Sequence, residues 1–187
     1  FGWRLLVPAD PNQADRMTRW ALSEPGNICI AMGRSKIPVV TDEKGEPFFG
    51  GGYVFRYGVL DLLRRGGDAA VITTGHMASR ALKAWEILKD QGVEVSVYHA
   101  GCPLHMESAA IAEAARTGRI VTFEDHHASS GLGSIVASKL LKTGNCCHIR
   151  TLGVTRYGDS GSSSDVLSAM ALDPEDLAAA VRSLMAL

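Results

Sequence analysis

Short apolar runs recur along the chain, and segments with helical periodicity separate them. The runs have the length and the β-branched content of strands, and they cover residues 5–7, 28–32, 69–74, 93–97, 120–124 and 148–154. Between them, apolar residues lie three and four positions apart, as they do on one face of a helix. The pattern therefore predicts strands that alternate with helices.

Capping residues mark where the predicted helices begin and end. The first helix follows Asp10, with Pro11 at its first position and Gln13 at its third, an arrangement typical of a capping box. It ends at Pro25-Gly26, and the last helix begins in a similar way after Asp173. Further helices are expected over residues 59–65, 76–90, 106–115 and 132–141, and a loop over residues 157–165.

Alternating strands and helices indicate an α/β protein, with a mostly parallel sheet and helices on both faces in three layers. Residues 41–52 interrupt this order with mixed charge, a proline and three consecutive glycines. Such a composition is typical of a linker. We therefore expect two parts, residues 1–45 and residues 46–187.

The charge balance and the apolar runs exclude two classes of partner. The 187 residues include 19 Lys and Arg and 20 Asp and Glu, for a formal net charge of −1. A surface that binds nucleic acid usually needs an excess of basic residues, so no nucleic-acid partner is expected. No apolar run approaches the roughly 20 residues of a membrane-spanning helix, so no membrane partner is expected either.

The cysteines and the first residues bear on the compartment. Cys29, Cys102, Cys146 and Cys147 lack the regular spacing of a disulfide framework, and a chain of this length does not need disulfides to fold. A cytoplasmic location is therefore expected. No basic segment followed by an apolar one stands at the start of the sequence, so we expect no signal peptide. Because the sequence begins at Phe1 instead of Met, we expect it to be a fragment or a processed product.

Three polar clusters could carry chemistry, but each has a plainer structural interpretation. Asp125-His126-His127 ends a predicted strand, where parallel sheets often bind ligands; adjacent histidines rarely reach one metal ion, which favours a packing or interface role. Residues 129–134 open a helix and could receive an anion, yet a helix start that needs tight packing explains the glycines there better. Cys146-Cys147 are a poor tetrahedral metal site because they are adjacent, which favours small buried thiols.

Arg34 is the candidate substrate-binding residue. It lies in Gly33-Arg34-Ser35-Lys36, directly after a predicted strand, where the ligands of parallel sheets gather. A guanidinium presents a planar fork of donors that suits a phosphate, although a surface ion pair is the commoner role for an arginine. The sequence shows no Ser-His-Asp set, no pair of catalytic carboxylates and no phosphate-binding P-loop, so no catalytic, cofactor-binding or metal-binding residue is predicted.

The order of these segments resembles the C-terminal part of the transketolases. Residues 7–12 are similar to the family's Pro-Ala-Asp-x-Asn stretch, and residues 32–38 to its strand end with an Arg and, four residues later, a Pro. Residues 121–134 are similar to its Val-Thr-x-Glu-(Glu/Asp)-His…Gly-Gly-Leu-Gly-Ser run. Residues 153–161 are similar to the last motif of the family along the chain, Gly-Val…(Phe/Tyr)-Gly-x-Ser-Gly. The resemblance covers nearly the whole chain.

This resemblance implies a thiamine-diphosphate enzyme that moves a two-carbon ketol unit between sugar phosphates, in the pentose phosphate pathway. It assigns residues 1–45 to the end of the pyrimidine-binding domain and residues 46–187 to the C-terminal domain, which is mainly structural and dimer-forming. Of the family's functional residues, only the Arg that holds the sugar phosphate is matched here, by Arg34.

The resemblance also implies which cofactor motif lies outside this chain and which partners the chain has. In the family, the motif that binds thiamine diphosphate and Mg²⁺ lies upstream, so this chain alone is expected to bind neither and to be inactive. The expected partners are the N-terminal part of the same enzyme, a second copy in a homodimer, and sugar-phosphate substrates.

Two alternatives are open. The run over residues 121–134 is shared with 1-deoxyxylulose-5-phosphate synthase and with the β subunits of 2-oxoacid dehydrogenases, and residues 57–66 look closer to their pattern. Gln13 and His76 also stand where transketolases often have Glu and Ser. The other alternative is a non-catalytic assembly domain built on the same sheet.

Overall fold

The structure, a computed structural model, describes residues 2–158 and 160–187, which form two sheets; Phe1 and Asp159 lie outside the described residues. The main sheet has five strands in the order β3-β5-β4-β6-β7. Their bounds are Leu60–Arg64 for β3, Ala69–Thr73 for β4, Val95–Ala100 for β5, Arg119–His127 for β6 and His148–Val154 for β7. Neighbouring strands are parallel except β3, which pairs with β5 in the antiparallel sense.

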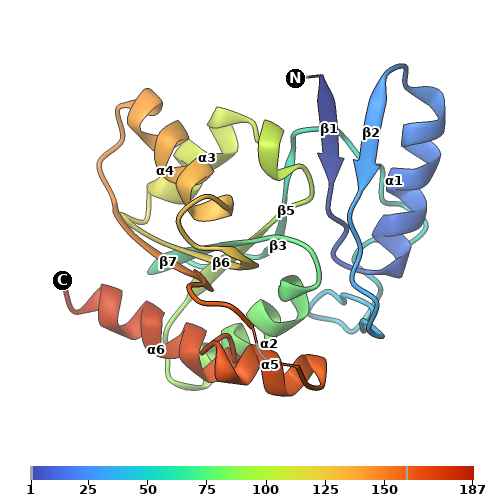
Figure 1. Cartoon of the computed structure of the whole chain (residues 1–187). Helices are drawn as coiled ribbons and strands as arrows, with labels where there is room; N and C mark the ends of the chain where they lie inside the picture. Colours follow the sequence, from blue (N-terminus) through green and yellow to red (C-terminus); the bar gives the residue numbers. More distant parts are fainter. Residues whose placement is uncertain (1, 159) are drawn as a thin grey trace.

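Helices cover both faces of the main sheet (Figure 1). On one face lie α2 (Met77–Asp90) and α6 (Pro174–Met185), and on the other lie α3 (Ser108–Ala115) and α4 (Leu132–Thr143). Successive residues of a strand point to opposite faces. On the central strand β4, Val71 accordingly packs in the apolar cluster with α2 and α6, and Ile72 in the cluster with α3 and α4. The predicted α/β fold, with a mostly parallel sheet in three layers, is confirmed.

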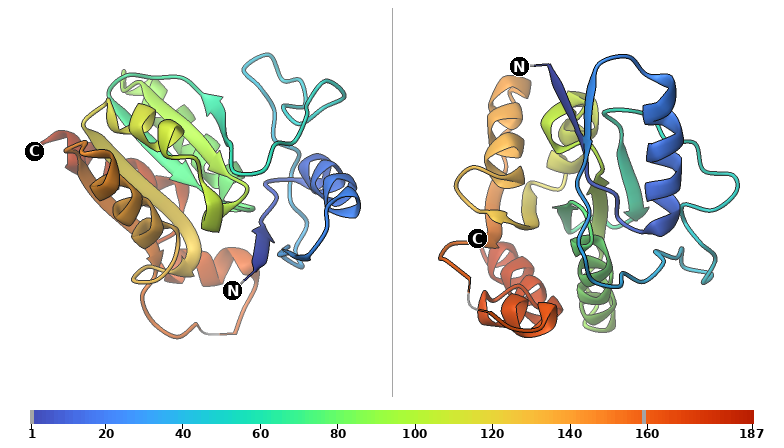
Figure 2. Two further views of the ribbon diagram at one scale, coloured as in Figure 1. Left: turned by 90° about the horizontal axis from the view of Figure 1, so that it is seen from above. Right: turned by 45° about the vertical axis from the view of Figure 1, so that its right-hand side comes forward.

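A smaller parallel sheet lies beside the main one (Figure 1 and Figure 2). It pairs β1 (Trp3–Leu6) with β2 (Asn27–Ile30), and α1 (Pro11–Ser23) connects them. The backbone N–H of Val7 donates to Gly101 O over 2.9 Å, just past the end of β5. The small sheet is therefore joined to the edge of the main sheet where its parallel strands end. That the chain divides into two parts at residue 45 stays a prediction.

Two predictions of secondary structure are wrong. Of the residues 59–65 predicted as a helix, Leu60–Arg64 form strand β3 instead, and Leu60, Leu63 and Arg64 are buried there. A helix of two turns is marginal by itself, whereas the free edge of β5 offers a backbone partner to every second residue. Residues 157–165 are not wholly a loop, because α5 (Ser163–Ala169) begins within them after its capping residue Ser162.

The prediction for the adjacent cysteines is also wrong in part. Cys146 is exposed and Cys147 is only half-buried, and both are free thiols. They precede β7, which is an edge strand of the main sheet, so no further strand covers them on that side.

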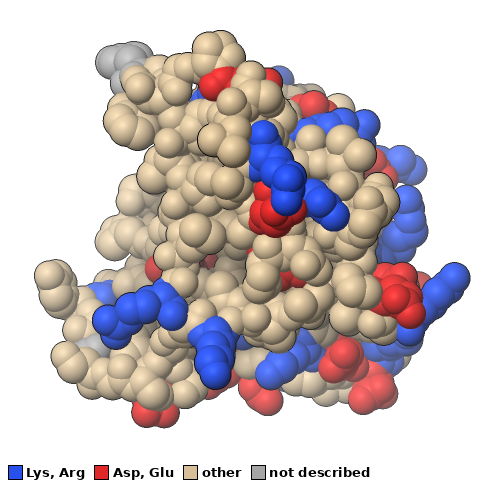
Figure 3. All heavy atoms as spheres, turned by 90° about the vertical axis from the view of Figure 1, so that its right-hand side faces the viewer, with Lys and Arg blue, Asp and Glu red and all other residues tan. Residues whose placement is uncertain are grey.

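Surface charge is mixed on the side of the molecule that carries β1, β2 and α1. Basic and acidic side chains are interspersed there, and neither sign forms a continuous surface (Figure 3). Arg19 of α1, for example, pairs with Asp15 over 3.0 Å. In the described parts of the chain, no helix has both the length and the apolar character needed to cross a membrane.

Candidate functional site

A cavity of about 590 Å³ lies at the edge of the main sheet where β4 and β6 end. From β4 the chain passes to β5 on one side, and from β5 it crosses to β6 on the other side of β4. At such a reversal, the loops that follow the two central strands diverge and leave room for a ligand. Thr73 of β4 pairs with Phe123 of β6, and His76 and Asp125, which follow them, line the cavity.

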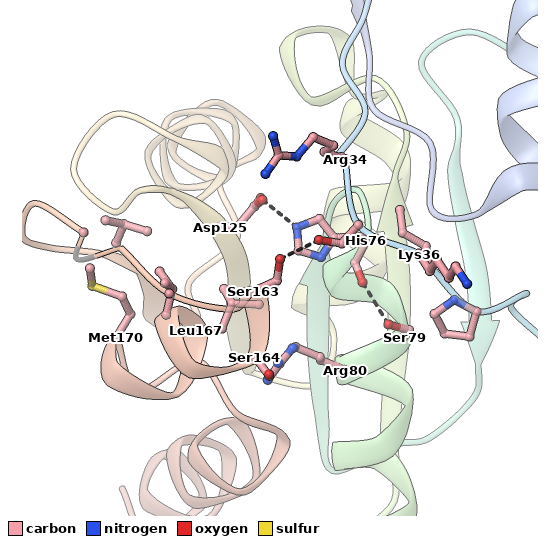
Figure 4. Close-up of a pocket in the computed structure, with 18 residues that line it drawn as sticks. Arg34, Lys36, His76, Ser79, Arg80, Asp125, Ser163, Ser164, Leu167 and Met170 are labelled. Carbon is pink, nitrogen blue, oxygen red and sulfur yellow. Dashed lines mark hydrogen bonds and ion pairs between the residues drawn. The ribbon is translucent and has the colours of Figure 1, made fainter.

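Three segments that are distant in sequence form the walls of the cavity (Figure 4). Residues 33–38, which follow β2, form one wall, the first turns of α2 form a second, and α5 forms a third. The polar or charged side chains that line it include Arg34, Ser35, Lys36, His76, Ser79, Arg80, Asp125, Ser163 and Ser164. The cavity thus brings together residues from both predicted parts of the chain.

Arg34 lies on the first wall, as an exposed side chain that extends toward Asp125 (Figure 4). It makes no hydrogen bond or ion pair with any described residue, and Lys36 extends in the opposite direction. Arg80 is already engaged, because its Nη1 donates to Asp173 Oδ1 over 2.6 Å. Within the described residues, Arg34 is therefore a cation that a ligand in the cavity can bind without breaking an ion pair.

His76 and Asp125 form a hydrogen-bonded pair beside Arg34. His76 Nε2 lies 2.8 Å from Asp125 Oδ2, and His126 Nδ1 lies 3.3 Å from the other carboxylate oxygen. Burial by itself raises the pKa of Asp125, but the hydrogen bond with His76 and the nearby imidazole charges outweigh it and hold that pKa below its ordinary value. Asp125 is therefore ionised near neutral pH, and its carboxylate holds the orientation of the His76 ring.

His76 is not among the site residues predicted from the sequence, although a signal exists. His76 comes a few residues after the end of the buried strand β4, and Asp125 lies near the end of the neighbouring strand β6. Of the cluster Asp125-His126-His127, Asp125 lines this cavity. His127 instead accepts through Nδ1 from the backbone N–H of Ser129 over 3.3 Å.

The start of α4 is not an anion site, because a carboxylate of the protein already occupies it. Glu124 is fully buried and accepts the backbone N–H of Leu132 over 2.5 Å and that of Gly133 over 2.8 Å. A side chain at residue 133 would bring its Cβ within 2.4 Å of Thr151 Oγ1. The interpretation that this segment serves tight packing is confirmed.

A buried polar network begins at the wall that carries Arg34. Asp10 accepts the backbone N–H of Gln13 through Oδ1 over 2.8 Å, which confirms the predicted cap, and accepts the N–H of Val40 through Oδ2 over 2.9 Å. Gln13 Nε2 then donates to Asp61 Oδ2 over 2.9 Å, and Tyr53 Oη donates to the same oxygen over 3.0 Å. The network therefore ties residue 40, after the Arg34 wall, to β3 of the main sheet.

The network continues toward the wall that carries His76. His99 of β5 is fully buried, and its Nδ1 lies 4.0 Å from Asp61 Oδ2, too far for a hydrogen bond. Its Nε2 accepts the backbone N–H of Gly75 over 3.1 Å, and Gly75 directly precedes His76. Two hydrogen-bonded series, one from Val40 to Asp61 and one from His99 to Gly75, thus lie on either side of this 4.0 Å separation.

The described residues do not fit thiamine diphosphate with Mg²⁺. A magnesium site needs several oxygen ligands, usually including carboxylates. Across residues 2–158 and 160–187, no three His, Cys, Asp or Glu side chains lie close enough together to hold a metal ion. The carboxylates near the cavity are already engaged, Asp125 with His76 and Asp173 with Arg80.

Comparison with known proteins relates this chain to the transketolases and to enzymes similar to them. Residues 58–177 match the family described as "Transketolase, C-terminal domain". A 1-deoxy-D-xylulose-5-phosphate synthase of Heliobacterium modesticaldum is 30% identical over 183 residues, which are 96% of this chain and 27% of the synthase. One subunit of an apulose-4-phosphate transketolase of Phocaeicola vulgatus is 26% identical over 178 residues, which are 94% of this chain and 54% of that relative. The chain thus spans about a quarter to about a half of these relatives.

A solved structure extends the similarity to the whole fold. A split-gene transketolase, described as an inactive β4 tetramer, superposes with a TM-score of 0.89 at 27% identity, over 100% of this chain and 59% of that one. The superposed region includes the small sheet and the segment with Arg34. Because the family model covers well over half of the residues, the chain belongs to the transketolase family, and residues 58–177 are a C-terminal domain of the transketolase type.

Proposed function

We propose that this chain is the C-terminal part of a thiamine-diphosphate-dependent enzyme that transfers a two-carbon ketol unit between sugar phosphates, as in the pentose phosphate pathway. In this proposal Arg34 holds the phosphate of the sugar. Membership of the transketolase family supports the reaction class, and the cavity beside Arg34 supports the role of this chain in binding the substrate.

The observation that carries the role of Arg34 is its unpaired guanidinium on the wall of a 590 Å³ cavity. A guanidinium that already pairs with a carboxylate has little to offer a phosphate, whereas a free one forms two parallel hydrogen bonds with it. The space also suits the size of a small ligand, since binding sites for small molecules begin at about 300 Å³.

The cofactor belongs to the part of the enzyme that lies upstream of this chain. When bound there, thiamine diphosphate supplies the carbanion chemistry of ketol transfer. The contribution of this chain is to bind and orient the phosphate end of the substrate. On this proposal, the chain by itself is inactive and is mainly structural.

The protein partners follow from the same proposal. A relative whose name describes one subunit of an enzyme, and a structure described as a split-gene tetramer, support an N-terminal partner and an oligomer. On the small sheet, Trp3 and Cys29 are exposed, which suits a strand pair that continues into a larger sheet. We expect a homodimer of the complete enzyme in the cytoplasm, with sugar phosphates as ligands and no role for nucleic acid or membrane.

A second candidate function is that of a 1-deoxy-D-xylulose-5-phosphate synthase. The observation that favours it is the 30% identity over 96% of this chain to a protein of that name. A β subunit of a 2-oxoacid dehydrogenase and a non-catalytic assembly domain are further alternatives, and no specific contact in the described residues favours either.

The test is an assay of this chain together with its upstream part, whether that part lies in the same gene or in a neighbouring one. The complete protein, with thiamine diphosphate and Mg²⁺, is given pairs of sugar phosphates, and the products are separated. Two-carbon transfer supports the proposal. Formation of 1-deoxy-D-xylulose 5-phosphate instead shows the second candidate to be correct, and the absence of both products contradicts both.

A further inference from the structure

We propose that a second cavity, beside β3, binds a free amino acid with an apolar side chain, whose ammonium group pairs with Asp61 and whose carboxylate pairs with Arg56. The residues that line this cavity differ throughout from those of the cavity beside Arg34. The inference therefore goes beyond the proposed function and does not depend on it.

The second cavity has a volume of about 430 Å³, which lies within the range of sites for small molecules. Its lining residues all belong to the segment 48–61. They include two aromatic, two aliphatic and two charged side chains, namely Phe48 and Tyr53, Val54 and Val59, and Arg56 and Asp61. The cavity thus combines apolar walls with one charge of each sign.

Asp61 offers one free oxygen to this cavity. Its Oδ2 accepts from Gln13 and from Tyr53, and these two donors fix the orientation of the carboxylate. Oδ1 has no hydrogen-bond partner among the described residues, and it is not one of the buried side-chain atoms that lack a partner there. Oδ1 is therefore accessible, and a donor that enters the cavity can reach it.

The surroundings of Asp61 favour an organic ammonium group as that donor. Burial and the negative charge of Asp61 raise the pKa of Tyr53 above its ordinary value, so the phenol stays protonated and keeps Oδ2 occupied. The aromatic faces of Phe48 and Tyr53 also attract a cation. A metal ion needs several oxygen ligands, and no group of three suitable side chains exists across residues 2–158 and 160–187.

Arg56 determines the other end of the ligand. It is exposed, and its guanidinium forms no hydrogen bond or ion pair with any described residue, Asp61 included. A ligand with a single charge would leave either Asp61 or Arg56 without a counterion, whereas a zwitterion pairs with both. A guanidinium binds a carboxylate through two parallel hydrogen bonds, so the carboxylate of an amino acid suits Arg56.

The remaining walls suit an apolar side chain on that amino acid. Val54 is 74% exposed and Phe48 is half-buried. A ligand that covers these side chains removes apolar surface from water, which is favourable. Glycine has no side chain to do so and should bind more weakly than leucine.

A purely structural role for Asp61 makes a different prediction. If its carboxylate only holds Gln13 and Tyr53, Asp61→Asn lowers the unfolding temperature and no amino acid binds to the wild type. Arg56→Gln separates the two roles, because the exposed guanidinium holds no other described residue and its loss should leave the fold intact.

The experiment is calorimetric titration of the complete protein with leucine and with three analogues. N-acetylleucine lacks the ammonium group, leucinamide lacks the carboxylate, and glycine lacks the apolar side chain. The variants are Arg56→Gln, Asp61→Asn and the control Arg65→Gln, which removes a nearby exposed arginine. Thermal unfolding of each variant is recorded beside the titrations.

We expect leucine to bind the wild type with a dissociation constant of about 1 mM or below, and each analogue to bind about tenfold more weakly. Arg56→Gln should weaken leucine by about tenfold and leave leucinamide unchanged, since leucinamide has no carboxylate to lose a partner. Asp61→Asn should likewise weaken leucine and leave N-acetylleucine unchanged. Arg65→Gln should bind leucine as the wild type does.

Three outcomes would overturn the inference. The first is that leucine does not bind the wild type. The second is that Arg56→Gln binds leucine as tightly as the wild type does, and this variant decides alone if Asp61→Asn does not fold. The third is equal binding of leucine and leucinamide, which would show a site for an amine or for the N-terminus of a peptide instead of an amino acid.

Discussion

Gln13 Nε2 donates to Asp61 Oδ2 over 2.9 Å, and this hydrogen bond joins α1 beside the small sheet to β3 of the main sheet. Gln13 is fully buried, and its Oε1 accepts the backbone N–H of Ala9 over 2.7 Å. Both ends of one amide are thus in use. A carboxylate at this position could still accept from Ala9, but it would face Asp61 as a second acid, which explains why an amide suits this chain.

Replacement of Gln13 by Leu should destabilise the protein by roughly 1.5–3 kcal/mol, because it leaves the half-buried Asp61 carboxylate with one donor fewer. Chemical denaturation of Gln13→Leu measures this loss. Gln91→Leu is the matched control, since it removes an amide whose hydrogen bond with Arg182 is exposed, and a surface change of this kind should stay within about 0.5 kcal/mol. Equal losses in the two variants would show that the buried amide has no special role.

Replacement of Arg34 by Ala should raise the Michaelis constant of the complete enzyme for phosphorylated substrates. The expected loss is roughly 1.5–3 kcal/mol, the range for a charged hydrogen bond, and part of it should reduce turnover because remote binding energy orients the reacting carbon. Substrates without a phosphate should react almost as before. The control Arg65→Ala removes an exposed arginine just past β3. Equal effects of Arg34→Ala on both kinds of substrate would remove Arg34 from the site.

Glu124 should make stability depend on pH. Burial is the main cause that raises its pKa above the ordinary value of 4.5, and the N–H groups of Gly133 and Leu132 only partly oppose it. The unfolded chain therefore loses this proton at a lower pH than the folded chain does. The contribution of Glu124 is full below pH 4.5 and falls as the pH rises through the raised pKa of the folded state.

The measurement for Glu124 is the free energy of unfolding of the wild type and of Glu124→Gln over this pH range. The variant cannot titrate at this position, so the advantage of the wild type should shrink as the pH rises. A difference that stays constant across the range would mean that Glu124 titrates alike in both states.

Hydrogen exchange should protect the main sheet more than the small one when this chain is studied alone. The strands β4 and β6 have neighbours on both sides, whereas β1 and β2 pair only with each other. Open edges exchange through local opening. The amides of β4 should therefore exchange much more slowly than those of β1. Equal protection would argue against the predicted division at residue 45.

Thiamine diphosphate with Mg²⁺ should not bind this chain alone. The described residues offer no cluster that suits the metal, and a diphosphate without its metal has few partners here. Calorimetry should show no heat beyond dilution. A dissociation constant in the micromolar range would contradict the assignment of this chain to the C-terminal part of the enzyme.

Local patterns predicted most of the fold, and the errors lie where a distant partner decides. The α2 segment could be predicted from its own apolar spacing, and the cap at Asp10 from three residues. Leu60–Arg64 form a strand because β5, more than 30 residues later, pairs with them. Similarly, the strand predicted over residues 93–97 lies at Val95–Ala100, where β4 and β3 flank it.

The candidate site was only half predictable for the same reason. Arg34 could be selected because an arginine after a strand has a recognisable use. His76 was not selected, because its place after a strand is informative only beside Asp125, which the pairing of β4 with β6 brings to 2.8 Å. The second bond of Asp10, to the N–H of Val40, is equally invisible in a sequence, since nothing local links residues 30 positions apart.

Hydrogen bonds hold Val40 to β3 through Asp10, Gln13 and Asp61, and another holds Gly75 to His99 of β5. Because β3 and β5 are paired strands of one sheet, the backbone beside each of these two walls of the cavity is anchored to the same sheet. A ligand therefore meets an opening of preset width, and little ordering of the walls remains to oppose its binding. The width of such a site therefore selects among ligands by their size. A phosphorylated compound that is too wide for the gap is rejected by its dimensions, without any closing motion of the walls.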